Sequence, residues 1–208
     1  MKGVPGTKGY GDQAEALIPR YETVPFEMGH AAILDLMPQT PSTVLDIGSG
    51  TGRDAAYLAG KGHQVTAVEP TDAFRTYAEV NHPSPNIVWI DDALPQLVSL
   101  NDQAACFDLI LLTAVWMHLD DAERRQGMAV LSRLLRPGGL LTMSLRHGPV
   151  PTGRVMYAVS ADETLSLARH HHLTAVRKRH TDSVQEPNKS AGVTWTRLAF
   201  RKHAEKGA

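Results

Sequence analysis

Residues 44–52 read Val-Leu-Asp-Ile-Gly-Ser-Gly-Thr-Gly, a short apolar run that ends in closely spaced glycines. The run has the length of a buried strand, and residues 55–61 after it predict a helix. A glycine turn between a strand and a helix lets a ligand approach the backbone, and the free N–H groups of the helix start favour a polar or anionic group. The stretch therefore predicts an α/β fold whose ligand lies at this turn.

The spacing of the glycines separates the ligand classes that use such a turn. Dinucleotide-binding loops follow the pattern G-x-G-x-x-G, whereas this turn reads G-x-G-x-G and places Arg53 where the dinucleotide pattern has its last glycine. A P-loop is excluded because no Gly-Lys-Ser/Thr triplet follows. Glu69 ends the next predicted strand and can accept hydrogen bonds from ribose hydroxyls, a feature that does not separate the nucleotide-type ligands.

Strand-like and helix-like segments alternate outward from this turn. Further strands are expected at residues 64–69, 87–90, 107–113 and 140–145, and further helices at 71–81, 120–135 and 160–171. The last two strands, near 174–180 and 193–201, have no predicted helix between them and should pair antiparallel. The pattern predicts an α/β fold: a Rossmann-like seven-stranded mixed sheet with helices on both faces and an antiparallel strand pair at the C-terminal end.

The composition restricts the class of protein. The chain has 208 residues, a formal net charge of −1 and one cysteine, Cys106. The balanced charge gives no sign of a nucleic-acid or membrane partner, and one cysteine excludes a disulfide framework and a cysteine-based metal cluster. No apolar run approaches the roughly 18 residues of a membrane span. We therefore expect a cytoplasmic protein without a metal site, whose oligomeric state the sequence does not predict.

Several motifs in order resemble those of the class I S-adenosylmethionine-dependent methyltransferases. They match that family's glycine motif, its second strand with a ribose-binding acid, its adenine-binding loop, its fourth strand and the turn before its fifth, at residues 44–52, 68–70, 90–95, 107–113 and 134–141. The resemblance covers residues 42–147 and is specific as a set. It implies a single methyltransferase domain over residues 1–208, with an N-terminal cap segment (1–40), a cofactor-binding core (42–147) and a C-terminal part (148–202). This last part would hold a substrate loop, the last helix and the antiparallel strands.

The same resemblance implies S-adenosylmethionine as the cofactor and S-adenosylhomocysteine as its product. The cofactor-binding residues that it implies are Asp46, Gly48, Ser49, Gly50, Glu69, Asp91, Asp92, Ala93 and Thr113. Glu69 would bind the ribose, and the glycine turn after the first strand would bind the methionine part. Asp92 would bond the adenine amino group, with the Ala93 N–H on a ring nitrogen. Asp91 stays an alternative to Asp92 because the sequence does not fix the register by one residue.

Two histidines are candidates for a general base. Methyl transfer from a sulfonium depends mainly on alignment and desolvation, and a base matters only when the acceptor atom carries a proton. His118 follows the fourth predicted strand and His147 ends the fifth, and histidine titrates near neutrality. His118 is equally consistent with a hydrogen-bonded histidine at a helix start.

Four further side chains are candidates for substrate contact. Tyr10 and Tyr21 flank the N-terminal amphipathic segment, which in the resembled family often covers the cofactor. Trp116 follows the fourth strand, and Arg146 ends the fifth, where it could bind a carboxylate or phosphate. Packing in the core is an equally good interpretation of Trp116, and packing at the domain edge of the two tyrosines.

The sequence favours a transferase (EC 2.1.1.-) that moves a methyl group to O, N or S of a small molecule. A methyltransferase acting on RNA or protein, or an S-adenosylmethionine-binding protein without transferase activity, stays an alternative. Enzymes that methylate base amines resemble one another in an Asp/Asn-Pro-Pro-aromatic motif, whereas residues 113–116 here read Thr-Ala-Val-Trp, so a nucleic-acid substrate is disfavoured. The glycine spacing disfavours an NAD-dependent oxidoreductase.

Overall fold

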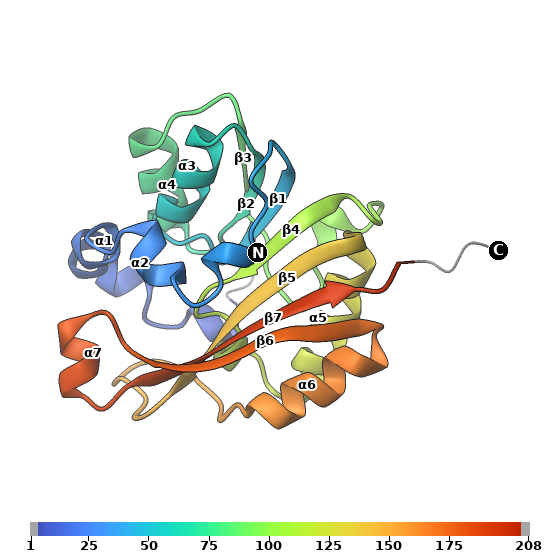
Figure 1. The fold of residues 1–208 in the computed structure, drawn as a ribbon. Coiled ribbons are helices and arrows are strands. Elements are labelled where there is room, and N and C mark those ends of the chain that lie inside the picture. Colours follow the sequence, from blue (N-terminus) through green and yellow to red (C-terminus); the bar gives the residue numbers. More distant parts are fainter. Residues whose placement is uncertain (1–3, 205–208) are drawn as a thin grey trace.

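A seven-stranded sheet forms the centre of the computed structural model, which describes residues 4–204 (Figure 1). The strands are β1 (Thr43–Ile47), β2 (Gln64–Val68), β3 (Ile87–Ile90), β4 (Phe107–Leu112), β5 (Leu135–His147), β6 (Leu173–Asp182) and β7 (Thr194–Lys202). Their order is β3-β2-β1-β4-β5-β7-β6. The first five pair parallel, and β7 pairs antiparallel with both β5 and β6. The predicted mixed sheet and its antiparallel C-terminal pair are confirmed.

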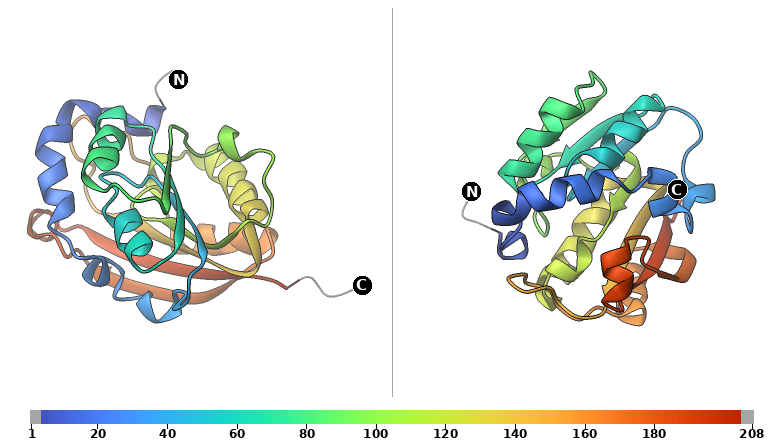
Figure 2. Two further views of the ribbon diagram at one scale, coloured as in Figure 1. Left: turned by 90° about the horizontal axis from the view of Figure 1, so that it is seen from above. Right: turned by 90° about the vertical axis from the view of Figure 1, so that its left-hand side faces the viewer.

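Helices cover both faces of this sheet (Figure 2). The α-helices of the described residues are α1 (Ala14–Glu22), α2 (Phe26–His30), α3 (Arg53–Gly60), α4 (Asp72–Asn81), α5 (Asp121–Leu134), α6 (Ala161–His170) and α7 (Glu186–Ser190). Short 3-10 helices are η1 (Pro5–Thr7), η2 (Gly11–Gln13), η3 (Leu34–Leu36), η4 (Val98–Leu100) and η5 (Trp116–His118). None of the helices within residues 4–204 has the length and hydrophobicity that crossing a bilayer requires.

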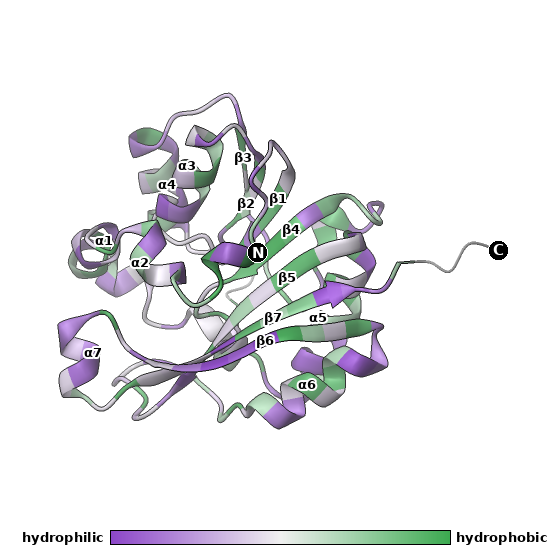
Figure 3. Ribbon diagram, viewed as in Figure 1, coloured by the Kyte–Doolittle hydropathy of each residue, from purple (hydrophilic) through white to green (hydrophobic). Residues whose placement is uncertain are grey.

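Alternation along the strands explains how one sheet supports two cores. Val44 of β1 packs in the cluster that contains α2 and α3, whereas Leu45 and Ile47 pack in the cluster that contains α5 and α6. Successive strand residues point to opposite faces, so a strand covered on both sides carries apolar residues on both of its faces. Figure 3 shows this for β4 and β5, whose residues are largely hydrophobic.

Side-chain caps mark where α5 and α6 begin. Asp120 accepts a hydrogen bond from the Glu123 N–H at 2.8 Å, and the Glu123 carboxylate accepts one from the Asp120 N–H at 2.8 Å. This reciprocal capping box starts α5 where the sequence predicts it. Ser160 caps α6 through the Glu163 N–H at 3.1 Å.

Departures from the prediction include β5, α7 and the short helix α2, which lies outside the predicted helices. β5 begins at Leu135 instead of residue 140, because Leu135 already pairs with Phe107 of β4 before the register shifts to Leu140 opposite Leu109. The short helix α7 separates β6 from β7, where no helix is predicted. It has five residues and none is buried, so it carries no apolar periodicity that a sequence could display. Residues 1–3 and 205–208 of the predicted domain lie outside the described residues.

Candidate functional site

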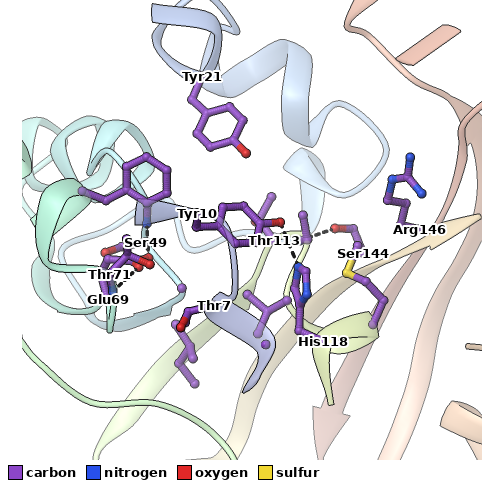
Figure 4. A pocket seen from close by; sticks show the side chains of 18 of the residues that line it. Thr7, Tyr10, Tyr21, Ser49, Glu69, Thr71, Thr113, His118, Ser144 and Arg146 are labelled. Carbon is purple, nitrogen blue, oxygen red and sulfur yellow. Dashed lines mark hydrogen bonds between the residues drawn. The ribbon is translucent and has the colours of Figure 1, made fainter. Parts of the chain in front are cut away.

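A cavity of about 380 Å³ lies at the carboxyl ends of the parallel strands (Figure 4). The turns that follow β1, β2, β3 and β4 all contribute to its lining. Strands β1 and β4 are neighbours in the sheet although β2 and β3 lie between them in sequence, so the chain reverses its winding at this point. Open α/β sheets bind ligands at such a reversal. N-terminal residues between Val4 and Val24 line the cavity from the other side.

The first glycine of the turn after β1 has no room for a side chain. Gly48 has φ +67°, and a Cβ built on it would lie 2.5 Å from Cγ2 of Val115. Its N–H and that of Ser49 donate to the Val68 carbonyl at 2.8 and 3.0 Å, which ties the turn to the end of β2. Gly50 has φ +58° with no heavy atom within 4 Å of such a Cβ. The two positions therefore share strain but differ in the space around them.

Glu69 holds the same turn through its carboxylate. Its Oε2 accepts from the Gly50 N–H at 2.9 Å and its Oε1 from the Thr71 N–H at 2.7 Å. The side chain is buried in the cavity wall, and burial raises its pKa although these hydrogen bonds act against that shift. Each oxygen retains lone pairs for further donors.

Two buried acceptors beside the turn have no partner among residues 4–204. Asp46 Oδ2 and Ser49 Oγ are both inaccessible and make no hydrogen bond. Burial and the neighbouring Asp54 carboxylate raise the pKa of Asp46 well above its usual value. A buried polar group without a partner is costly, so these atoms indicate a ligand with hydrogen-bond donors or a positive charge.

A buried ion-pair network supports this wall. His30 of α2 contacts Asp54 of α3 at 2.7 Å, and Arg53 donates to the same carboxylate at 2.6 Å and to the Tyr21 carbonyl at 2.7 Å. The network lowers the pKa of Asp54 to about 2 against the effect of its burial. It thereby fixes α1 and α2 to the start of α3. The sequence analysis did not identify it, because His30 and Asp54 are 24 residues apart and form no motif.

The two acids in the loop after β3, Asp91 and Asp92, lie in different surroundings. Asp92 is buried and lines the cavity, and its carboxylate accepts from the N–H groups of Ala93 and Ser99, both at 2.7 Å. Asp91 lies outside the cavity lining and faces Arg75 at 3.5 Å. The Ala93 N–H, expected to meet an adenine nitrogen, is thus already engaged by Asp92.

Tyr10 and His118 form a hydrogen-bonded pair that crosses the cavity (Figure 4). The Tyr10 hydroxyl lies 3.0 Å from Nε2 of His118, and Nδ1 of His118 lies 2.8 Å from the Val155 carbonyl. A carbonyl only accepts, so Nδ1 carries the proton and Nε2 accepts from Tyr10. Burial lowers the pKa of His118 and raises that of Tyr10.

The other predicted contacts divide between the cavity and the interior. Tyr21, Thr113 and Arg146 line the cavity. Trp116 does not: it is completely buried in the hydrophobic core, because η5 turns it away from the cavity. His147 also lies outside the lining, bonded to Thr196 at 2.8 Å and stacked near His180. It follows Arg146 in an extended strand and therefore points to the opposite face.

Three polar residues are of particular interest among the lining residues that the sequence analysis did not identify. Ser144 of β5 accepts from the Ala114 N–H at 2.8 Å, Arg154 lies with its guanidinium carbon 3.5 Å from the centre of the Tyr10 ring, and Arg197 is a buried cation of β7. A signal for one of them exists in hindsight. Arg197 is a charged residue inside the run Trp-Thr-Arg-Leu-Ala-Phe of a strand that is otherwise buried.

Comparison with known proteins agrees with this architecture. Residues 45–143 match the family model described as a methyltransferase domain. An uncharacterized methyltransferase of Oceanobacillus iheyensis is 26% identical over 132 residues, which cover 64% of this chain and 59% of that protein. The chain spans about half to three fifths of the length of the curated relatives it matches.

Solved structures share the fold over most of the chain. The 1,6-didemethyltoxoflavin-N1-methyltransferase of Burkholderia thailandensis, solved with 1,6-didemethyltoxoflavin and S-adenosylhomocysteine bound, is similar with a TM-score of 0.71 and 24% identity. That match covers 93% of this chain and 85% of the other. The (4+2)-cyclase SpnF is similar with a TM-score of 0.65 and 16% identity, over 89% of this chain and 80% of its own. At 24% and 16% identity, the similarity to these two structures establishes a shared fold and no more.

Proposed function

We propose that this chain, whose residues 45–143 match a methyltransferase domain, is a class I S-adenosylmethionine-dependent methyltransferase that transfers the methyl group to O, N or S of a small molecule. The observation that carries the proposal is the pair of buried, unpartnered acceptors beside the glycine turn, Asp46 Oδ2 and Ser49 Oγ. They lie where this family resemblance places the methionine part of the cofactor. These two unpartnered atoms, together with the fold, therefore support S-adenosylmethionine as the ligand.

The residues of this wall fit S-adenosylmethionine. Asp46 offers a carboxylate to the ammonium group of the amino-acid part, and Ser49 a hydroxyl beside it. Glu69 keeps lone pairs on both oxygens for the ribose hydroxyls, since each accepts only one backbone N–H in the structure. Asp92, buried at the far end of the same wall, is assigned to the adenine amino group.

The N-terminal cover over the cavity supports a small acceptor. When bound, the cofactor supplies a methyl group on a sulfonium centre that needs no further activation. The chain contributes alignment and exclusion of water, because η1, η2 and α1 cover the strand ends. Met117 and Val115 of the wall are apolar and line the space beyond the glycine turn. A macromolecular acceptor would have to displace this N-terminal cover.

His118 is the group we assign as proton acceptor for acceptors that carry a proton. Its lowered pKa leaves it neutral at pH 7, and the Val155 carbonyl holds its proton on Nδ1. The Tyr10 hydroxyl occupies Nε2, so the proton of the acceptor would pass to the Tyr10 oxygen while the Tyr10 proton moves to His118 Nε2. Tyr10 is suited to this relay because burial raises its pKa and keeps it protonated.

Calorimetric titration of the purified chain tests the cofactor assignment. We expect S-adenosylhomocysteine to bind at one site and NAD, titrated in parallel, to produce no heat of binding. Binding of NAD alone would contradict the proposal. A screen of small heteroatom nucleophiles with radiolabelled S-adenosylmethionine then tests transfer itself.

The similarity to SpnF motivates one competing function. That protein is named a cyclase and shares this fold, so the fold alone does not establish methyl transfer. A chain that binds S-adenosylhomocysteine but transfers no label to any acceptor in the screen would favour this alternative. The Tyr10–His118 hydrogen bond in the cavity supports transfer, because it places a neutral imidazole where a proton acceptor would be needed.

A further inference from the structure

Arg197 is a buried cation without a counter-ion. The residue is 8% exposed and lines the cavity from β7. Its guanidinium makes no hydrogen bond or ion pair with any side chain or carbonyl in the described chain, residues 4–204. The nearest aromatic contact is its own neighbour Trp195, whose ring centre lies 5.3 Å from the guanidinium carbon. No Arg197 nitrogen is among the fully inaccessible unpartnered atoms of the described residues, so the largely buried guanidinium is open to the cavity and a ligand group can reach it there.

The register of β5 with β7 gathers further polar groups around it. Ser144 pairs with Arg197, and Arg146 pairs with Trp195. Residues directly opposite across a ladder, and residues two apart along a strand, share one face, so these four side chains face the cavity together. All four line it. They form a patch of two cations, one hydroxyl and one indole, which we call the β5–β7 patch.

The acids of the cavity do not neutralise this patch. Asp54 attracts Arg197, but its carboxylate is already bound by Arg53 and His30. Burial outweighs that attraction and lowers the pKa of Arg197 to about 10, at which the guanidinium is still a cation at pH 7. Among residues 4–204, the Arg146 guanidinium donates only to carbonyls of its own loop, of which that of Pro149 is at 2.8 Å.

We propose that the methyl acceptor carries a carboxylate or phosphate group, and that Arg197, with Arg146 beside it, binds this group. The inference rests on the proposed function, since it names the class of acceptor for the same cavity. A planar guanidinium binds such oxygens through two parallel hydrogen bonds. The Trp195 indole adds a flat apolar surface for the rest of the acceptor.

The cofactor itself carries a carboxylate, which has the same chemistry. The order of the strands favours the acceptor. β7 lies three strand spacings from β1, which is about 14 Å at roughly 4.8 Å per spacing. The glycine turn that receives the amino-acid part follows β1. The β5–β7 patch therefore lies on the side of the cavity away from that turn.

Ligand-observed NMR titration with benzoate and benzamide tests the proposal. The two probes have the same shape and differ in charge, and both are titrated into protein with and without saturating S-adenosylhomocysteine. We expect benzoate to bind at least about tenfold more tightly than benzamide. Arg197→Gln should lower the affinity for benzoate about tenfold or more and leave that for benzamide unchanged, whereas Arg197→Lys should lose less because it retains the charge. Arg179→Gln is the matched control, since Arg179 is the exposed partner of Arg197 on β6 and lies outside the cavity lining.

Three results would overturn the assignment. The wild type could bind both probes equally, or Arg197→Gln, folded by its melting curve, could bind benzoate as the wild type does. Alternatively, Arg197→Gln could weaken S-adenosylhomocysteine but not methylthioadenosine, which lacks the amino-acid carboxylate; the arginine would then serve the cofactor. Should the glutamine variant not fold, Arg197→Met, which keeps a long side chain without the charge, carries the same comparison, and an unchanged affinity for benzoate would overturn the assignment as well. Absence of S-adenosylhomocysteine binding contradicts the proposed function instead, and the titrations without it still test Arg197.

Discussion

The two ends of the cavity differ in the sign of the charge that they leave unpaired. At the glycine turn the groups without partners are acceptors, the buried Asp46 Oδ2 and Ser49 Oγ. At the β5–β7 patch they are cations, since neither Arg146 nor Arg197 forms an ion pair with an acid of the described chain. One cavity therefore presents a negative and a positive end. A ligand pair consisting of a cationic cofactor and an anionic acceptor would satisfy both.

The side chains at the two ends are also held in place by different interactions. The acidic end is held by backbone amides, because Glu69 and Asp92 each accept two N–H groups. The cationic end is held by strand register, because β5 and β7 align its side chains in two adjacent pairs. Substitutions should therefore separate the two ends, with affinity for the cofactor sensitive at one and insensitive at the other.

The largest effect is expected at Glu69. Glu69→Ala removes the acceptors of both ribose hydroxyls, which should cost about 3 kcal/mol, or roughly a hundredfold in affinity for S-adenosylhomocysteine; the lost hydrogen bonds to the amides of Gly50 and Thr71 should in addition lower the free energy of unfolding. Calorimetry measures the change. Asp91→Ala is the control, since this acid lies nearby but outside the cavity lining, and its affinity should match the wild type. Equal losses in both variants would contradict the assignment of Glu69.

A smaller loss is expected at the first glycine of the turn. Gly48→Ala places a methyl group 2.5 Å from Val115 Cγ2 in a left-handed conformation, so the turn must shift, and we expect roughly a thirtyfold weaker affinity for S-adenosylhomocysteine. Gly50→Ala meets only the conformational strain, since no heavy atom lies within 4 Å of the new methyl group. The order of the two affinities, measured by calorimetry, is the prediction; the reverse order would show that the Val115 contact does not shape the turn.

Asp46→Asn should cost about tenfold in affinity for S-adenosylhomocysteine, because an amide replaces the carboxylate that faces the ammonium group. The pKa of Asp46 is raised in the folded protein, so the wild type should bind more tightly as pH rises through that pKa, and the variant should lack this dependence. The same raised pKa destabilises the ligand-free fold at pH above the ordinary value for aspartate, so the variant should melt at a higher temperature at pH 7. A lower melting temperature with unchanged affinity would contradict the role of Asp46.

The smallest effect concerns the titration of His118. Burial lowers its pKa below the usual 6.5, so its imidazole should stay neutral at pH 7, with the proton on Nδ1. By linkage it should contribute stability that is present above pH 6.5 and lost as pH falls through its lowered pKa. Nitrogen-detected NMR of labelled histidine reports both the tautomer and the midpoint. A midpoint above 6.5, or a proton on Nε2, would contradict the proposed relay.

The acidic end could be predicted from the sequence because its residues follow strands. The strand ends are marked in the sequence by runs of apolar residues. At or just after the carboxyl ends of β1, β2 and β3 lie Asp46, Glu69 and Asp92, respectively. The choice between Asp91 and Asp92 could not be predicted, since it depends on which of two adjacent side chains the turn buries. The structure places these three side chains in the cavity wall, and their contacts with the cofactor are predictions.

The cationic end could not be predicted because it depends on pairing between distant strands. Only the register of β5 with β7 brings Arg197 next to Ser144, 53 residues earlier in the chain. Local geometry also explains why His147 and Trp116 lie outside the cavity lining. A one-residue difference in an extended strand sends His147 to the face opposite Arg146, and the short helix η5 turns Trp116 into the core.

A crystal structure of the protein with S-adenosylhomocysteine tests the opposition of the two ends most directly. The account predicts the homocysteine ammonium within hydrogen-bond distance, about 3 Å, of the Asp46 carboxylate. It also predicts that the guanidinium of Arg197 does not contact the homocysteine carboxylate. A homocysteine carboxylate bound to Arg197, with Asp46 still unpartnered, would contradict the account.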